Sequence, residues 1–298
     1  MKILVTGVTG FVGYTLTNYL KNNGCDVIGV SRSAGKCVDF TADLTNIESV
    51  KEIRRKFKPN VIIHLAAMAR TDECEKNPED SYKVNVISTK NLAEVFSDKK
   101  FIFFSTYAVY NTPEGNCDEL CDVKATNQYI STKIDAEKHV VCLSNYLIFR
   151  PSVIFGYMPE TTRTNNYFMQ LLNMVKTKTT MRSPADQYFN PILVDYVCEI
   201  ILLSLKNDLR GIYNLGASDS VSKYEFNEMV LSKFGFDKKY LEKAVPSKND
   251  VIRPSVGTIS SAKIMSDLSY DIPSVKDMIS VLYDKISTYP IIKELTDD

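Results

Sequence analysis

The sequence predicts a doubly wound α/β fold, a parallel sheet covered by helices on both faces, joined to a smaller and mostly helical lobe. Three observations favour this fold. Short runs rich in Val, Ile and Phe alternate with helical patterns through the first half of the chain. A glycine-rich turn directly follows the first of these runs. From Gly156 onward the alternation loosens and helical patterns predominate. Alternating strands and helices imply right-handed crossovers and therefore a parallel sheet.

The predicted elements follow one another regularly up to residue 151. Helices are expected from the glycine turn to residue 24, at residues 50–56 and 81–96, and through Tyr129, where apolar residues recur at helical spacing. One later strand is expected at residues 211–216. Strands are expected where the apolar runs are short and continuous, at residues 2–7, 25–30, 60–67, 100–106 and 145–151.

The composition excludes several classes of function. The chain has 298 residues, and its 36 Lys and Arg balance its 36 Asp and Glu. No global basic field therefore exists to bind nucleic acid or an anionic membrane. No apolar run approaches the roughly 18 residues that span a bilayer, and we expect a cytoplasmic protein. Seven irregularly spaced cysteines and two histidines predict neither a disulfide framework nor a metal site.

The glycine turn predicts a dinucleotide site. In TGVTGFVG, Gly7, Gly10 and Gly13 stand between the first strand and a helix. This spacing allows a tight turn, close approach to a pyrophosphate and close packing of helix on strand, as in the Rossmann fold. The helix N-terminus then points at the anion. We therefore predict a dinucleotide-binding domain of residues 1–156 and 188–216, and a substrate-binding lobe of residues 157–187 and 217–298.

The end of the second strand indicates which dinucleotide binds, because that position meets the adenosine ribose. An acid there would hydrogen-bond a free 2′-hydroxyl, whereas an arginine would pair with a 2′-phosphate. The chain has Ser31 and Arg32 and no acid, so NADP(H) is favoured and NAD(H) is the alternative. Asp43 and Leu44 fall where a third strand would end beside the adenine. Asp43 is expected either to accept a hydrogen bond from the adenine or to cap the next helix.

Tyr129 and Lys133 are the predicted catalytic pair. In YISTK they stand four residues apart, so on a helix they share one face. A neighbouring ammonium is expected to lower the tyrosine pKa from about 10, which suits proton transfer to or from an alcohol. One strand upstream, Ser105 and Thr106 end a predicted strand at the sheet edge where open α/β folds bind ligands. Thr106 is expected to hydrogen-bond the carbonyl oxygen that Tyr129 protonates.

These motifs resemble those of the extended short-chain dehydrogenase/reductases, and the chain is most similar to the dTDP-4-dehydrorhamnose reductases. The resemblance runs nearly from end to end. It includes the glycine turn, HLAAMARTDECEKNP, VN at Val84 and Asn85, the Ser105, Thr106, Tyr129 and Lys133 set, IFRPSVIFG, NNY, DQYFNPILV, and Arg253 with Pro254.

The resemblance also implies roles for individual residues. Lys133 would bind the nicotinamide ribose as well as tune Tyr129, and Thr106 and Tyr107 would face the substrate. Gly10, Phe11 and Val12 would contact the cofactor pyrophosphate, Ala66, Ala67 and Met68 would line the cofactor cleft, and Asn166 and Arg253 would contact the nucleotide sugar.

Departures from related families narrow the predicted reaction. Sugar-nucleotide 4,6-dehydratases follow the threonine with an Asp-Glu pair, where this chain has Tyr107 and Ala108. The prediction is therefore NADPH-dependent reduction of the C4 ketone of a nucleoside-diphosphate 4-keto-6-deoxy sugar, by a homodimer that serves dTDP-rhamnose and polysaccharide biosynthesis. The alternatives are a nucleotide-sugar 4-epimerase with tightly bound NAD(P), and a non-catalytic NADP-binding regulatory subunit like the β subunit of methionine adenosyltransferase.

Overall fold

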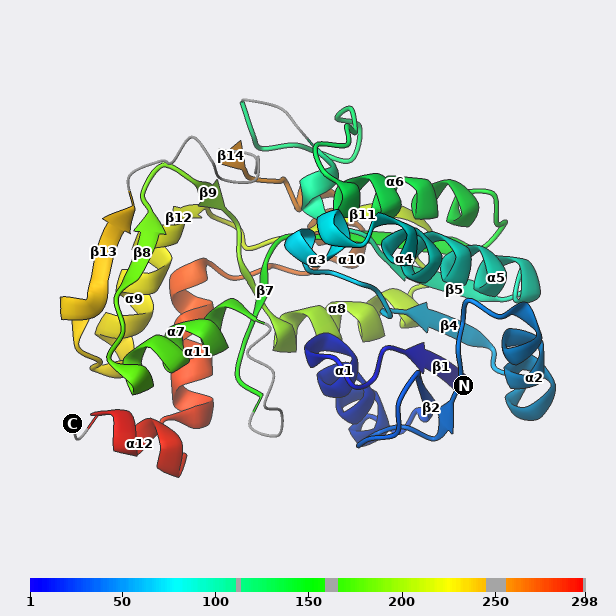
Figure 1. The fold of residues 1–298 in the computed structure, drawn as a ribbon, viewed down its shortest axis with the longest axis horizontal. Coiled ribbons are helices and arrows are strands. Elements are labelled where there is room, and N and C mark those ends of the chain that lie inside the picture. The colour runs from blue at the N-terminus through cyan, green and yellow to red at the C-terminus, as the bar shows by residue number, and fades with distance from the viewer. Residues whose placement is uncertain (111–113, 159–165, 245–255, 297–298) are drawn as a thin grey trace. The chain divides into compact units, whose positions relative to one another are not determined.

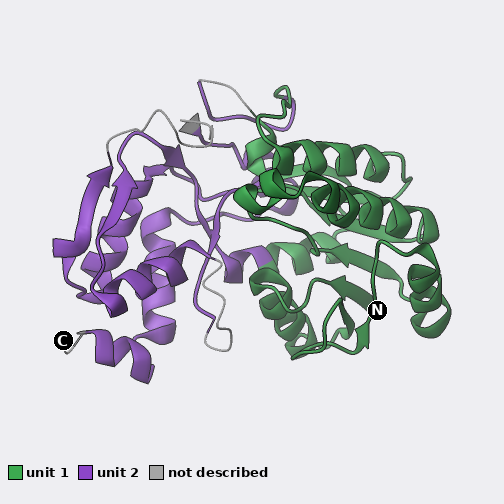
Figure 2. Cartoon of the chain, in the orientation of Figure 1, with its two compact units in different colours: residues 1–111, 121–151, 198–213 green, residues 112–120, 152–197, 214–298 purple. Residues whose placement is uncertain are grey.

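The computed structural model describes residues 1–110, 114–158, 166–244 and 256–296. Contacts divide the chain into two compact units (Figure 2). Unit 1 comprises residues 1–111, 121–151 and 198–213, and unit 2 comprises residues 112–120, 152–197 and 214–298. The division predicted from the sequence is a different one, because it separates a cofactor-binding domain from a substrate-binding lobe. It assigns residues 1–156 and 188–216 to the first and residues 157–187 and 217–298 to the second, and it stays a prediction.

A seven-stranded sheet in the order β11-β6-β5-β4-β1-β2-β3 organises unit 1 (Figure 1). Its neighbouring pairs from β6 to β3 are parallel. Interior strands are buried along nearly their whole length, as expected where helices cover both faces. The prediction of a doubly wound parallel sheet is confirmed. The strands are β1 (Lys2–Thr6), β2 (Asp26–Ser31), β3 (Phe40–Thr41), β4 (Val61–His64), β5 (Lys100–Phe104), β6 (Tyr146–Pro151) and β11 (Gly211–Leu215).

Helices lie on both sides of this sheet. On one side, apolar residues of α2, α5 and α6 share a core with β4, β5 and β6, including Ile53, Leu92, Phe96, Phe101 and Ala136. On the other side lie α1 and α8 (Figure 1). The helices are α1 (Phe11–Asn22), α2 (Ile47–Phe57), α3 (Thr71–Lys76), α4 (Pro78–Tyr82), α5 (Ser88–Val95), α6 (Gln128–Val140) and α8 (Val194–Lys206), with a short 3₁₀ turn η2 (Tyr107–Val109).

The helix expected at residues 81–96 is not one regular α-helix. A π-helical turn, η1 (Lys83–Ile87), joins α4 to α5. Single π turns inside helices are uncommon and often occur at functional sites. This turn contains Asn85, which is 2% exposed. Its side chain accepts a hydrogen bond from the Met68 backbone, in the loop after β4.

Unit 2 combines helices with small sheets. β7 (Ile154–Phe155) pairs with β10 (Ile192–Leu193), β8 (Met181–Pro184) pairs with β13 (Leu241–Ala244), and β9 (Tyr188–Phe189) lies between β12 (Val221–Ser222) and β14 (Val256–Gly257). Its core is aromatic, with Phe226 packed edge-on against both Phe155 and Phe189. The remaining elements are α7 (Tyr167–Thr177), α9 (Lys223–Phe234), η3 (Lys238–Tyr240), α10 (Ala262–Leu268), α11 (Val275–Ile286) and α12 (Pro290–Thr296).

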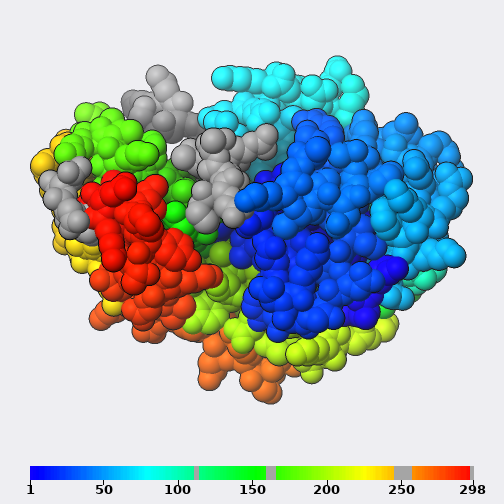
Figure 3. Space-filling model, turned by 90° about the horizontal axis from the view of Figure 1, so that it is seen from below, coloured from blue at the N-terminus to red at the C-terminus, as the bar shows by residue number. Residues whose placement is uncertain are grey.

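Described elements near both ends of the chain reach the molecular surface. The N-terminal segments (blue) and the C-terminal helices (red) are each visible on the face drawn in Figure 3. Within the described ranges, no helix combines the length and the apolar character needed to cross a membrane.

Candidate active site

The glycine turn between β1 and α1 leaves no room for a side chain at Gly7 or Gly13. Gly7 has φ +74°, and a Cβ there would lie 2.7 Å from the backbone nitrogen of Ala66. A Cβ at Gly13 would lie 2.3 Å from the carbonyl oxygen of Gly7. The positive φ favours glycine at the first position and the close helix packing requires it at the second. Gly10 begins α1 without a side-chain cap, so Phe11 and Val12 lie in the first turn with backbone N–H groups suited to an anion.

The end of β2 lies beside this turn. The Ser31 hydroxyl is 3.1 Å from the Thr9 hydroxyl, which ties β2 to the glycine turn. The Arg32 side chain is exposed. Parallel pairing of Ser31 with Thr41 brings the β3 end next to the β2 end, so the two predicted adenosine-binding segments are neighbours.

Asp43 and Leu44 follow β3, and the structure corrects one interpretation of Asp43. The carboxylate of Asp43 accepts hydrogen bonds from the backbone and hydroxyl of Thr45, at 2.9 and 2.7 Å. The N-cap of α2 is Asn46, whose side chain accepts from the Glu48 backbone. The alternative that Asp43 caps the helix is therefore wrong, because the helix begins one turn later. Leu44 is buried in the core.

The loop after β4 holds Ala66, Ala67 and Met68 and is clamped by Asn85. The Asn85 side chain accepts a hydrogen bond from the Met68 backbone at 2.7 Å and donates to the Met68 carbonyl at 3.0 Å. It also donates to the Thr132 hydroxyl on α6 at 2.9 Å. Asn85 therefore links the predicted cofactor loop to the helix of Tyr129. In the sequence, the only signal for Asn85 is its place in the family motif VN.

Thr106, Tyr129 and Lys133 lie together at the carboxyl edge of β5. Thr106 follows β5, and its side chain lies close enough to Tyr129 to influence the pKa of that phenol. Lys133 donates to the carbonyl of Phe104, the last residue of β5, and lies 4.1 Å from the centre of the Phe103 ring. The helix begins where Asn127 caps it, accepting from the Ile130 backbone. The structure thus brings together the three residues predicted as catalytic, whose roles stay predictions.

The titration of Tyr129 differs from the expectation. Burial raises the pKa of Tyr129 above its ordinary value, the nearby Cys74 adds to the rise, and the neighbouring Thr106 only partly offsets it. The expected lowering by Lys133 is wrong for this chain, because desolvation penalises the phenolate more than any neighbour stabilises it. Tyr129 is therefore a neutral phenol near neutral pH and has a proton to donate.

Burial also shifts the pKa of Lys133, but downward, because the charged form of a lysine is its protonated form. Burial lowers the pKa of Lys133 to about 7, and the Glu137 carboxylate one turn along α6 opposes that change. The side chain is 4% exposed. His64, which also faces Lys133, has its pKa lowered to about 3, first by burial and then by the lysine charge. Neutral His64 hydrogen-bonds the hydroxyls of Thr6 and Thr89, so it has a packing role in unit 1.

The residues of unit 1 fit a dinucleotide. The bare glycine turn provides a cradle that a Cβ would fill, and the uncapped α1 N-terminus provides free N–H donors. At the β5 edge the Ser105 hydroxyl, 5% exposed, is without a hydrogen-bond partner among the described residues. Buried hydroxyls are normally paired, so this one is available to a ligand.

The structure describes some, but not all, of the residues predicted to bind the substrate. Tyr107, in η2, is half-buried and contributes to the electrostatic surroundings of Tyr129. Asn166 belongs to unit 2, where it caps α7 by accepting from the Met169 backbone at 3.1 Å. Arg253 lies outside the described residues.

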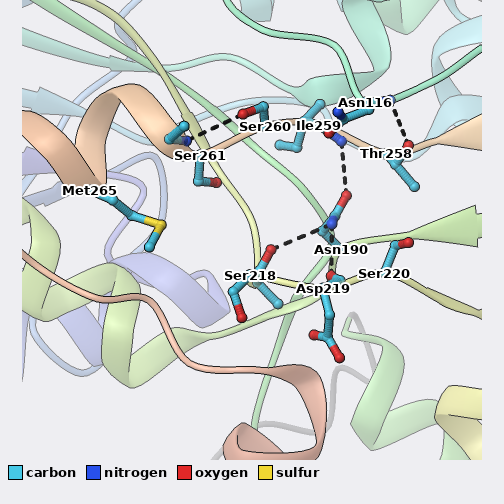
Figure 4. A pocket seen from close by; sticks show the side chains of 12 residues that line it. Asn116, Asn190, Ser218, Asp219, Ser220, Thr258, Ile259, Ser260, Ser261 and Met265 are labelled. Atoms are coloured by element: carbon cyan, nitrogen blue, oxygen red, sulfur yellow. Dashed lines mark hydrogen bonds between the residues drawn. The ribbon is translucent and has the colours of Figure 1, made fainter.

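Unit 2 also contains a polar pocket of about 330 Å³ (Figure 4). Asn190 occupies its centre, donating to the Asp219 carbonyl at 2.7 Å and accepting from the Ile259 backbone at 2.8 Å. These bonds hold three chain segments together, which is a structural role. Among the described residues, none of those predicted for the site lines this pocket. It is formed by Asn116, Asn190, residues 217–220 and 258–262, and Met265.

Comparison with known proteins places the chain in a recognised family. The model of the RmlD substrate binding domain matches residues 1–287. A probable low-salt glycan biosynthesis reductase of Haloferax volcanii is 24% identical over 97% of the chain and 99% of its own length. The dTDP-4-dehydrorhamnose reductase of Escherichia coli K12 is 29% identical over 78% of each chain. A methionine adenosyltransferase 2 subunit beta of Danio rerio is 26% identical over 80% of this chain and 76% of its own.

Solved structures share the fold. A dTDP-4-dehydrorhamnose reductase of Clostridium acetobutylicum superposes with a TM-score of 0.85 at 24% identity, covering 97% of this chain and 100% of that one. A second, from Bacillus anthracis in complex with NADP, has a TM-score of 0.82 at 23% identity, covering 95% and 99%. The predicted resemblance to the dTDP-4-dehydrorhamnose reductases is confirmed by the family model and by relatives of that name.

Proposed function

The chain belongs to the RmlD substrate binding domain family, and from this membership we propose that it catalyses NADPH-dependent reduction of the C4 ketone of a nucleoside-diphosphate 4-keto-6-deoxy sugar. The observation that carries the proposal is the grouping of Thr106, a neutral Tyr129 and the buried Lys133 at the carboxyl edge of β5. Relatives named dTDP-4-dehydrorhamnose reductase support the substrate class. A relative solved with NADP supports the cofactor.

The residues divide the work of a reduction. Bound NADPH supplies the hydride. Tyr129 donates its proton to the developing alkoxide, and its raised pKa keeps that proton in place until a stronger base forms. Thr106 holds the oxygen in line with the phenol. Lys133 stabilises the negative charge that passes to Tyr129, and it is expected to bind the nicotinamide ribose.

The glycine turn, Ala66 to Met68 and the adenosine segments are proposed to hold the cofactor. Gly7, Gly10, Phe11 and Val12 would meet the pyrophosphate through backbone N–H groups. Ser31 and Arg32 would meet the 2′-phosphate, with Asp43 and Leu44 near the adenine. The nucleotide sugar is proposed to meet Thr106, Tyr107, Asn166 and Arg253.

Replacing Arg32 with alanine is expected to raise the KM for NADPH by about tenfold to a hundredfold, because charge-assisted hydrogen bonds contribute about 1.5 to 3 kcal/mol. The KM for NADH should be unchanged, since NADH lacks the 2′-phosphate. Steady-state kinetics with both cofactors would measure this, and Arg55→Ala, an exposed arginine on α2, is the matched control. Equal losses for both cofactors would contradict the role assigned to Arg32.

The central test is NADPH oxidation by the purified protein, followed by nicotinamide absorbance. dTDP-, GDP- and UDP-linked 4-keto-6-deoxy sugars are offered in turn, and product is identified by mass spectrometry. Stoichiometric oxidation with one of them is the expected result and names the nucleotide. Interconversion of UDP-sugars without net oxidation would instead indicate a 4-epimerase.

A regulatory subunit is the second candidate, because a methionine adenosyltransferase 2 subunit beta is among the relatives. The grouping of Thr106, Tyr129 and Lys133 at one edge of the sheet favours the enzyme. Tight NADPH binding with no turnover of any offered sugar would favour the subunit and overturn the reductase.

A further inference from the structure

Unit 1 buries a charged cluster that the reaction described above does not use. Arg150 on β6 is 4% exposed, and its two principal partners, Glu137 on α6 and Tyr110 after η2, are 6% and 4% exposed. Burying charges carries a desolvation cost that an apolar replacement avoids. A buried arginine with three directed bonds therefore calls for an explanation beyond packing.

Two of the bonds reach the catalytic helix. The Nε and Nη2 atoms of Arg150 donate to the two carboxylate oxygens of Glu137 at 3.1 and 2.6 Å. Glu137 follows Lys133 by four residues and Tyr129 by eight, so the three side chains share one face of α6. A bidentate arginine–carboxylate pair fixes distance and orientation together. Arg150 on β6 therefore holds α6 at a defined position and rotation about its axis relative to the sheet.

The third bond reaches the segment that holds Thr106. Nη1 of Arg150 donates to the Tyr110 hydroxyl at 2.9 Å, and the guanidinium lies 5.0 Å from the centre of the Tyr110 ring. Tyr110 ends the turn that Thr106 begins, where the Thr106 hydroxyl accepts from the Ala108 backbone at 3.2 Å. The strands are also in register here, because the Ser105 backbone donates to the Phe149 carbonyl at 2.7 Å.

We propose that Arg150 is a positioning residue, which holds the Thr106 turn and the Tyr129–Lys133 face of α6 at the separation that proton transfer requires. The inference rests on the proposed reductase function. Its physical basis is that one rigid guanidinium joins two segments that are distant in sequence, through Glu137 and Tyr110. A lysine cannot reproduce this, since its ammonium lacks the planar fork of donors.

The test uses Arg150→Lys, which keeps the charge, and Tyr110→Phe, which removes one hydroxyl. Hydrogen exchange followed by mass spectrometry is expected to show about tenfold faster exchange in peptides covering residues 104–110 and 129–137 for Arg150→Lys, because the link between them is lost. For Tyr110→Phe the faster exchange should be confined to residues 104–110. Peptides from β1 and α1 should be unchanged in both.

Kinetics provide the second readout. kcat should fall by about tenfold to a hundredfold in Arg150→Lys, as expected for small misplacement of catalytic groups, while the Kd for NADPH changes less than about threefold. Two controls change neither quantity: Tyr146→Phe, a partly buried tyrosine on the same strand, and Asp208→Asn, which breaks the ion pair with Lys100 at the other end of β5.

The outcomes separate the inference from the proposed function. Unchanged exchange in both named peptides, or equal acceleration throughout unit 1, would overturn the positioning role. If no sugar is reduced by the wild type, the proposed function fails, and the exchange data and the NADPH Kd still decide whether Arg150 joins the two segments. If Arg150→Lys does not fold, Tyr110→Phe decides the same question.

Discussion

Replacing Tyr129 with phenylalanine is expected to lower kcat for NADPH oxidation by about a thousandfold or more. The phenol lies beside Thr106 at the carboxyl edge of β5 and keeps its proton near neutral pH, and general acid catalysis typically contributes about 10² to 10⁴-fold. The Kd for NADPH should change little, because the ring is retained and only the hydroxyl is lost. Single-turnover absorbance and fluorescence titration measure the two quantities.

The matched control is Tyr82→Phe, a tyrosine 43% exposed on α4, which should have wild-type kinetics. Retention of more than about a tenth of wild-type kcat by Tyr129→Phe would show that the proton comes from another group. Because burial raises the pKa of Tyr129, wild-type kcat should not fall near neutral pH through ionisation of this phenol.

Replacing Lys133 with methionine is expected to abolish detectable turnover and to change how stability depends on pH. The methionine fills similar space but neither donates to Phe104 nor stabilises charge on Tyr129. Loss of the proposed ribose contact should also weaken NADPH binding by about tenfold or more. Fluorescence titration and kinetics measure these losses, and Lys138→Met, exposed on the same helix, is the control.

The sign of the stability change follows from the shift of the Lys133 pKa from 10.5 to about 7. Between these values the unfolded chain binds a proton that the folded chain releases, so the free energy of unfolding rises with pH across this window. Below about pH 7 the full cost of burying the ammonium is present, on the order of 5 kcal/mol. Lys133→Met removes this term.

Urea unfolding at several pH values tests this directly. The stability of the wild type relative to Lys133→Met should increase between about pH 7 and about pH 10. The charged or titratable neighbours, Glu137, Arg150 and His64, are the same in both proteins. A difference that does not vary with pH would show that Lys133 is not desolvated in the folded protein.

The sequence by itself determined the sheet, the glycine turn and the grouping of Thr106, Tyr129 and Lys133. Each depends on local rules: continuous apolar runs make buried parallel strands, a glycine turn between strand and helix makes an anion cradle, and spacing of four residues puts two side chains on one helical face. Carboxyl ends of parallel strands share one edge, so Thr106 was expected near Tyr129.

Only the tertiary structure determined the pKa values of Tyr129 and Lys133 and the hydrogen bonds that hold the segments of this site in place. Whether Lys133 lowers the Tyr129 pKa depends on desolvation, which no spacing reveals, and burial proved the larger effect. Asn85 binds Met68 and Thr132, which are 17 and 47 residues away, and Arg150 binds Tyr110 across 40 residues. Such partners are chosen by packing among segments distant in the chain. A local sequence pattern therefore predicts the catalytic groups, while the folded chain determines their pKa values and what holds them in place.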